Sequence, residues 1–190
     1  MNQGIDRSLA DDDWILFWGS DDQAPSETIL EDVASRLKTY QETHSAPDLF
    51  VCSGAYYRHD PTHLDSQALI FSRETKFHFR HSYRRSLFFG STPPHQATFF
   101  GPKAFRRVPG FSTSLKLAAD LDYFLRLSKH SDVSVVVEDL EVVWLGDAGV
   151  SSQHNKRRLR EVAMAYRNAF GFLCWFPFML RYWQRLKSLH

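Results

Sequence analysis

The chain has 190 residues, 43% of them hydrophobic and 24% charged, which suits one domain with a packed core and argues against disorder. Lys and Arg number 23 against 22 Asp and Glu, so the chain lacks the basic surplus of a nucleic-acid-binding protein. Two cysteines, Cys52 and Cys174, are too few for a disulfide framework or a zinc cluster and indicate reduced thiols in the cytoplasm.

The first half of the chain is typical of an α/β protein. Trp14–Trp18 is short, apolar and bounded by turn residues, which predicts a buried strand. Ser26 is the expected N-cap of a following helix, whose inward positions are Ile29, Leu30, Val33, Leu37 and Tyr40. Two further strands are predicted over Asp48–Tyr57 and Gln67–Arg73.

The second half mixes short elements with one long basic helix. Glu74–Pro94 is rich in Arg, His and aromatic residues and predicts a long loop with some short helix. Asn155–Phe170 predicts a basic amphipathic helix with Leu159, Val162, Ala163 and Tyr166 inward. The segments between them predict an extended piece, two helical segments and two strands: Gln96–Phe100, Pro102–Val108, Leu115–Lys129, Val133–Val137 and Glu141–Leu145.

Two adjacent carboxylates, Asp21 and Asp22, follow the first predicted strand directly. A pair of aspartates in isolation is usually a solvated turn before a helix. At the end of a strand in an open α/β sheet, however, it lies where ligands bind. Adjacent carboxylates repel each other unless a cation or a proton intervenes, and hard oxygen ligands suit Mg²⁺ or Mn²⁺ completed by substrate phosphates.

Other polar groups occur at comparable positions further along. His95 and Gln96 stand at the entrance to an apolar strand, and Asp120 and Asp122 at the start of a helix. The Gly/Ser-rich turn in "WLGDAGVSS", Trp144–Ser152, leads into the basic helix. Each has a plain structural reading as a core histidine, a helix cap or a loop, but their order and spacing favour one shared site.

These segments resemble the family 2 glycosyltransferases of GT-A fold, the bacterial type that builds surface polysaccharides. The resemblance spans roughly Met1 to Gly171 and comprises "MNQGI" with "DDDWILFWGSDD", "PPHQATFFGPKAF", "FSTSLKLAADLDYFLRL" and "GDAGVSS". It implies a Rossmann-like mixed sheet flanked by helices. It also implies an inverting transfer of sugar from a nucleotide-diphosphate sugar to a hydroxyl of a glycan or lipid-linked acceptor.

The resemblance assigns a role to each candidate residue. Asp21 and Asp22 match the donor-binding pair, with Asp22 preferred for the Mg²⁺ or Mn²⁺ ion and Asp21 for either the metal or the ribose of the donor. Asp120 matches the catalytic base. His95 and Gln96 match the acceptor side, where Asp122 is assigned a supporting role.

The resemblance also predicts a missing portion. In the family, "MNQGI"-like sequence lies well inside the domain, so we expect residues 1–170 to be a partial GT-A domain without its N-terminal third. The first strands and the aspartate that contacts the nucleobase would then be absent. A half-sheet exposes strand edges, which predicts self-association.

Residues 171–190 form an aromatic and basic tail, expected to be an amphipathic helix that Pro177 kinks. It either packs on the domain or lies on the anionic inner face of the plasma membrane as a peripheral anchor. The longest apolar run, Gly171 to Leu180, is about half of what a spanning helix needs. The N-terminus has no signal-peptide pattern.

Two other functions share some of these features. A different metal-dependent phosphotransfer enzyme would also use the carboxylate pair, but it gives no reason for His95, Gln96 or Asp120. A non-catalytic remnant that binds a membrane or a partner transferase would explain the short N-terminus.

Overall fold

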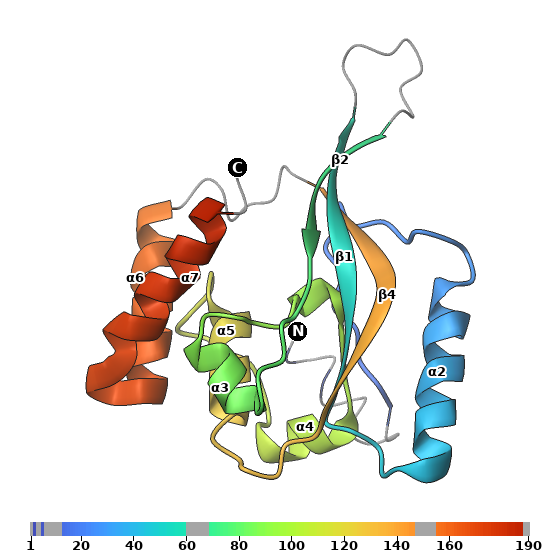
Figure 1. Ribbon diagram of the computed structural model, residues 1–190, viewed down its shortest axis with the longest axis horizontal. Coiled ribbons are helices and arrows are strands. Elements are labelled where there is room, and N and C mark those ends of the chain that lie inside the picture. The colour runs from blue at the N-terminus through green and yellow to red at the C-terminus, as the bar shows by residue number, and fades with distance from the viewer. Residues whose placement is uncertain (1, 3–4, 6–12, 60–68, 147–154, 188–190) are drawn as a thin grey trace.

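The computed structural model describes residues 2, 5, 13–59, 69–146 and 155–187, and its centre is a four-stranded sheet (Figure 1). β1 (Leu49–His59) is the central strand, and β4 (Val135–Gly146) runs parallel along one of its edges. Two antiparallel strands share the other edge, β3 (Thr98–Phe100) on the first residues of β1 and β2 (Leu69–Thr75) on its last. The sheet is therefore organised around β1.

Side chains of β1 alternate between two apolar clusters, one on each face of the sheet. Phe50 and Cys52 belong to the cluster that α2 (Ile29–Thr43) covers, together with Ile29, Val33 and Leu37 of that helix. Leu49 and Val51 belong to the larger cluster on the opposite face. Successive residues of a strand point to opposite faces, so one apolar strand supplies both cores.

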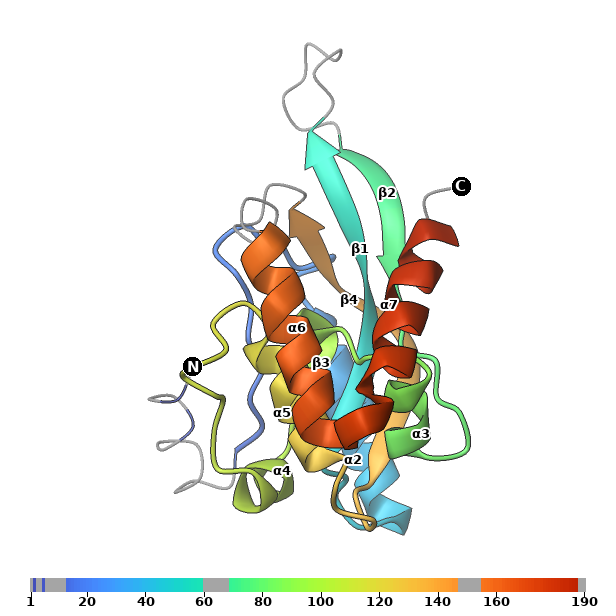
Figure 2. The same cartoon turned by 90° about the vertical axis from the view of Figure 1, so that its left-hand side faces the viewer.

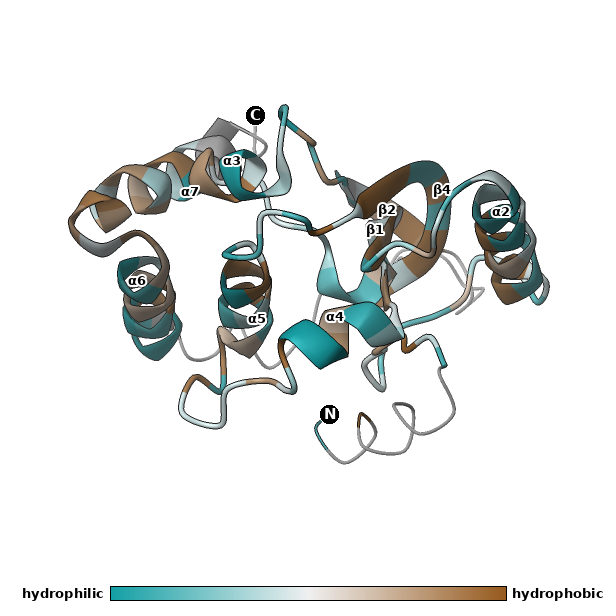
Figure 3. Ribbon diagram, turned by 90° about the horizontal axis from the view of Figure 1, so that it is seen from below, coloured by the Kyte–Doolittle hydropathy of each residue, from teal (hydrophilic) through white to brown (hydrophobic). Residues whose placement is uncertain are grey.

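Four helices that follow β2 in the chain cover the larger cluster. They are α3 (Tyr83–Phe88), α4 (Pro102–Arg107), α5 (Ala119–Leu127) and α6 (Asn155–Phe170). Figure 3 shows α2 on one side of the sheet and α5, α6 and α7 on the other. This open mixed sheet flanked by helices, with a helix at the C-terminus, confirms the predicted α/β fold class.

The tail forms a 3-10 turn, η3 (Gly171–Cys174), followed by α7 (Trp175–Lys187), which packs beside α3 and α6 (Figure 2). Phe176 stacks on Phe88 of α3, with ring centroids 5.4 Å apart. Phe178 and Tyr182 pack against the larger core cluster. The tail is thus helical, and part of its surface packs on the domain. Among the described helices, none combines the length and the apolar character needed to cross a bilayer.

The strand predicted over Trp14–Trp18 is wrong in its extent. The segment makes a single bridge, in which the amides of Ile15 and Phe100 each donate to the other's carbonyl at 3.0 and 2.8 Å. β3 is only three residues long, so its free edge offers too little backbone for a longer ladder. All five residues of the segment are only partly buried.

The two strands predicted over 133–137 and 141–145 are in fact one strand, β4. Glu138 and Asp139, between the two predicted strands, lie in a bulge where the register with β1 shifts between Val51 and Ser53. A bulge accommodates extra residues without ending the ladder.

Several predicted ends also move. The first helix begins at Ile29, after Thr28 rather than Ser26, and Leu30 is exposed. The helix predicted from Leu115 begins at Ala119, and the 3-10 turn η1 (His95–Ala97) precedes β3. The bounds of α6 match the prediction. Val162 and Tyr166 lie on its buried face, but Leu159 lies outside that face and is 45% exposed.

Candidate active site

The carboxylate pair lies beside the carboxyl ends of the parallel strands β1 and β4. The backbones of Gln23 and Trp144 pair through two hydrogen bonds of 2.9 and 2.8 Å, which hold the segment against the end of β4. The hydroxyl of Tyr57, near the end of β1, donates to the carbonyl of Asp21 at 3.1 Å. The structure therefore brings Asp21 and Asp22 to the edge where open α/β sheets bind ligands.

Two glycines make room for these carboxylates. A Cβ added at Gly146 would lie 3.0 Å from Oδ2 of Asp21 and 3.2 Å from its carbonyl oxygen. A Cβ at Gly19 would lie 2.9 Å from Oδ1 of Asp21. A larger residue at Gly19 or Gly146 would therefore require the Asp21 carboxylate to move.

The electrostatics of the pair fit a cation. Burial raises the pKa of Asp22 above its ordinary value, the amide of Gly19 opposes that rise by donating to the carboxylate, and the charge of Asp21 adds to it. The described residues contain no cluster of three or more His, Cys, Asp or Glu side chains. A Mg²⁺ or Mn²⁺ ion held by one or two carboxylates, with phosphates and waters as its other ligands, suits this donor set.

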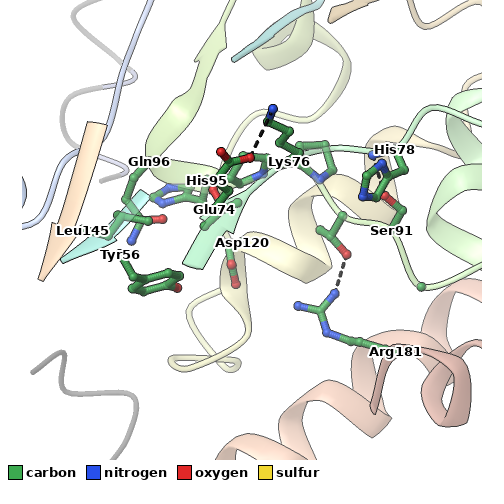
Figure 4. Close-up of a pocket in the computed structure, with 15 residues that line it drawn as sticks. Tyr56, Glu74, Lys76, His78, Ser91, His95, Gln96, Asp120, Leu145 and Arg181 are labelled. Atoms are coloured by element: carbon green, nitrogen blue, oxygen red, sulfur yellow. Dashed lines mark hydrogen bonds and ion pairs between the residues drawn. The ribbon is translucent and has the colours of Figure 1, made fainter. Parts of the chain in front are cut away.

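A cavity of about 450 Å³ lies next to this edge (Figure 4). Two of its lining residues, Tyr56 and Leu145, lie near the carboxyl ends of β1 and β4, whereas Asp21 and Asp22 themselves do not line it. The cavity also collects polar side chains from five parts of the chain: Glu74, Lys76, His78, His95, Gln96, Asp120 and Arg181. Three predicted residues that are distant in sequence from Asp21, namely His95, Gln96 and Asp120, thus share one cavity.

His95 is held by aromatic rings. Its imidazole stacks on Phe17, with centroids 5.5 Å apart and planes 10° apart, and meets the edge of Phe111. Its Nε2 atom is buried without a hydrogen-bond partner among the described residues. Burial lowers the pKa of His95, and the charge of Asp120 opposes that shift. The ring is therefore neutral near pH 7 and retains an unused polar atom.

Asp120 lies in the first turn of α5 and lines the cavity, whereas Asp122 does not. Asp122 is buried and accepts a hydrogen bond from Nε of Arg126 at 2.8 Å, and Arg126 in turn donates to the carbonyl of Gly110. The structure thus places Asp122 outside the cavity, and its supporting role stays a prediction. Asp122 lies two residues after Asp120 on the helix, so its side chain points away from the cavity. Through Arg126 it links α5 to Gly110 in the preceding loop.

Three charged residues of the cavity were missed from the sequence. Two of them are Lys76 and Glu74, which form an ion pair of 3.2 Å in a segment without a recognisable motif. Lys76 also pairs with Asp139, outside the cavity lining, at 3.3 Å. Arg181 was counted only as a basic residue of the tail, and nothing in its spacing indicates that α7 folds back to the cavity. Residues 147–152 of the "WLGDAGVSS" turn lie outside the described part of the chain.

No protein-family model matches the chain, and no curated protein gives a significant match. Solved structures of TarS from S. aureus do match. The structure of TarS 1–349 has a TM-score of 0.50 at 15% identity, over 94% of this chain and 50% of that chain. A second structure, of TarS, has a TM-score of 0.52 at 15% identity, over 93% of this chain and 30% of that one.

A third match is TarS 1–349 in complex with UDP-GlcNAc, with a TM-score of 0.51 at 15% identity, over 86% of this chain and 46% of that chain. The present chain thus spans half or less of these TarS chains. At this identity the likeness concerns the fold alone, which this chain shares with part of the TarS structures.

The electrostatic interaction between Asp120 and His95 predicts a linked titration. We expect His95 to titrate below its ordinary value of 6.5, and Asp120→Asn to lower its pKa further because the favourable negative charge is lost. Imidazole NMR signals followed against pH measure both values. Asp132→Asn, at an exposed carboxylate that pairs with Arg107, is the control and should leave His95 unchanged. An unaltered His95 titration in Asp120→Asn would contradict the arrangement.

Proposed function

We propose that the chain is a nucleotide-sugar-dependent glycosyltransferase of family 2 and GT-A fold, acting in the assembly of a bacterial polysaccharide or lipid-linked glycan. The observation that carries the proposal is the cavity that unites His95 and Asp120 next to the strand edge bearing Asp21 and Asp22. Two findings support the proposal: the likeness in fold to TarS, and the solved complex of TarS with UDP-GlcNAc. The TarS chain is longer, and the match covers 46% of it.

At the donor end, Asp21 and Asp22 would hold the diphosphate of the nucleotide sugar through Mg²⁺ or Mn²⁺. When bound, the cation supplies positive charge that stabilises the leaving nucleoside diphosphate. Gly19 and Gly146 keep the carboxylates close to the ends of β1 and β4. The raised pKa of Asp22 supports this assignment because a nearby cation would offset its causes, which are burial and the Asp21 charge.

At the acceptor end, Asp120 would take the proton of the attacking hydroxyl. The hydroxyl oxygen forms a bond to the anomeric carbon while the bond from that carbon to the diphosphate oxygen breaks, which inverts the anomeric centre in one displacement. The proton passes to the carboxylate of Asp120. Neutral His95, with its unpartnered Nε2, and Gln96 would position the acceptor beside it.

The first test concerns the donor. Asp22→Asn should weaken Mn²⁺-dependent binding of UDP-GlcNAc by about tenfold or more, because one metal ligand loses its charge. Isothermal titration with and without Mn²⁺ measures the effect on the chain as it stands. Glu31→Gln on the far helix α2 is the control and should bind as the parent does. Equal Mn²⁺-dependent affinity in Asp22→Asn would remove the metal role from this residue.

The second test concerns the base. Asp120→Asn should slow the release of UDP from UDP-GlcNAc, with water as the probe acceptor, by about 10²-fold or more. Donor affinity should change little, because Asp120 acts on the acceptor. A parallel collapse of donor affinity would instead place Asp120 at the donor.

Product analysis separates this function from its alternatives. A metal-dependent phosphotransfer enzyme would move a phosphoryl or nucleotidyl group and leave the sugar on its phosphate. A non-catalytic chain that binds a partner transferase would release no UDP. Transfer or hydrolysis at the anomeric carbon of labelled UDP-GlcNAc would exclude both.

We also propose that the tail binds anionic membranes at their surface. One face of α7 packs on the domain, but Trp175, Met179 and Trp183, spaced four residues apart, are each about 60% exposed. Phe172 of η3 is 91% exposed. Basic residues Arg185 and Lys187 follow on the same helix in the sequence. An aromatic stripe with nearby cations is typical of an interfacial helix.

Vesicle sedimentation tests this second function. We expect stronger binding to anionic than to neutral vesicles, and weaker but persistent binding at high salt, because salt screens charge and not apolar burial. The double substitution Trp175→Ser with Trp183→Ser should remove binding without unfolding the chain, since both side chains are exposed. Leu30→Ser, at an exposed apolar position of α2, is the matched control. Failure to sediment with anionic vesicles would end the membrane proposal.

A further inference from the structure

Arg181 projects from the C-terminal helix to the wall of the cavity (Figure 4). Its Nη1 donates to the hydroxyl of Thr92, a neutral partner. Its Nε is buried without a hydrogen-bond partner in the described part of the chain, where no carboxylate lies within ion-pair distance of it. A partly buried guanidinium whose charge is uncompensated is costly, and a buried polar atom without a partner calls for an explanation such as a bound ligand or ion.

Lys76, the other Lys or Arg side chain that lines the cavity among the described residues, differs from Arg181 in this respect. Lys76 is neutralised by Glu74 and Asp139 at 3.2 and 3.3 Å. Asp120, on the α5 side, has no ion pair with Arg181 within 4.0 Å. Among the described residues, neither the Asp120 carboxylate nor the Arg181 guanidinium has an ion-pair partner. The two groups come from different helices, and together they are complementary to a ligand with a hydroxyl at one end and an anion at the other.

The fold positions Arg181 closely. A Cβ added at Gly90, which has φ +81°, would lie 2.9 Å from the backbone nitrogen of Arg181 and 3.0 Å from its Cα. The loop after α3 thus contacts the backbone of α7 at this residue, and only glycine adopts that conformation without strain. The stack of Phe176 on Phe88 holds the same helix one turn earlier.

We propose that Arg181 recognises an anionic group, a phosphate or a carboxylate, on the acceptor, so that the C-terminal helix forms one wall of the acceptor site. The proposal rests on the glycosyltransferase function proposed above and names the substrate class of that site. The planar guanidinium offers paired donors that match the oxygens of either anion. Asp120 would then face the reacting hydroxyl of the same acceptor.

The test compares matched neutral and anionic sugars. Binding of glucose, glucose 6-phosphate and glucuronate is measured by NMR titration of the chain without donor, and the last two separate phosphate from carboxylate recognition. We expect at least one anionic sugar to bind about tenfold more tightly than glucose. Arg181→Gln should abolish that preference and Arg181→Lys should retain part of it. Arg167→Gln, at an exposed cation of α6, is the control and should retain all of it.

Gly90→Ala tests the positioning. It should reduce the anion preference although Arg181 is still present, because α7 must shift from the loop. A melting curve of each variant confirms that the chain remains folded. Equal binding of neutral and anionic sugars by the parent chain, or an undiminished preference in folded Arg181→Gln, would overturn the proposal.

UDP-GlcNAc binding, measured on the same variants, separates this inference from the proposed function. Arg181→Gln should bind the donor as the parent does, and a matching loss of donor affinity would assign Arg181 to the donor diphosphate and overturn the acceptor role. Donor binding without any anion preference would refute the inference alone. An anion preference that depends on Arg181, in a chain that binds no UDP-GlcNAc, would refute the glycosyltransferase function and leave only an anion site.

Discussion

The parallel pairing of β1 with β4 is the constraint on which the rest of the structure depends. It requires close contact at Gly54, where an added Cβ would lie 2.8 Å from the carbonyl oxygen of Val143. It requires apolar cover on both faces, which α2 supplies on one and α3 to α6 on the other. It also brings the carboxyl ends of both strands to one edge, where Tyr57 and Trp144 fix the segment that carries Asp21 and Asp22.

The second organising contact is the packing of the C-terminal helix α7 beside α3 and α6. α7 buries Phe178 and Tyr182 against the main core and still leaves a row of aromatic side chains exposed. The same helix brings Arg181 to the cavity that holds His95 and Asp120. One element thus contributes to packing, to the proposed acceptor wall and to the proposed membrane surface, each through a different face.

Sequence patterns predicted those parts of the fold that depend on local periodicity. α6 has the expected bounds, and Ile29, Val33 and Leu37 of α2 are buried as its spacing required, whereas Tyr40 is partly buried and Leu30 is exposed. What failed depends on partners that lie far along the chain. Trp14–Trp18 has strand composition but meets a partner strand of only three residues, and β4 continues through Glu138 and Asp139 because β1 is long enough to pair on both sides of the bulge. Of the site, motif order was enough to bring His95, Gln96 and Asp120 together. It could not place Arg181, since no local pattern states which residue of a packed helix will face a cavity.

The central claim is that the strand-end carboxylates and the cavity form one site for a nucleotide sugar and its cation. Paramagnetic broadening of backbone amide signals by Mn²⁺, with UDP-GlcNAc present, tests it most directly because the broadening falls off steeply with distance from the ion. The account predicts the strongest broadening at residues 19–23, Tyr57 and Gly146, weaker effects along the cavity at Gln96 and Asp120, and none on the outer face of α2. Broadening centred elsewhere, or the same pattern in Asp22→Asn, would contradict it.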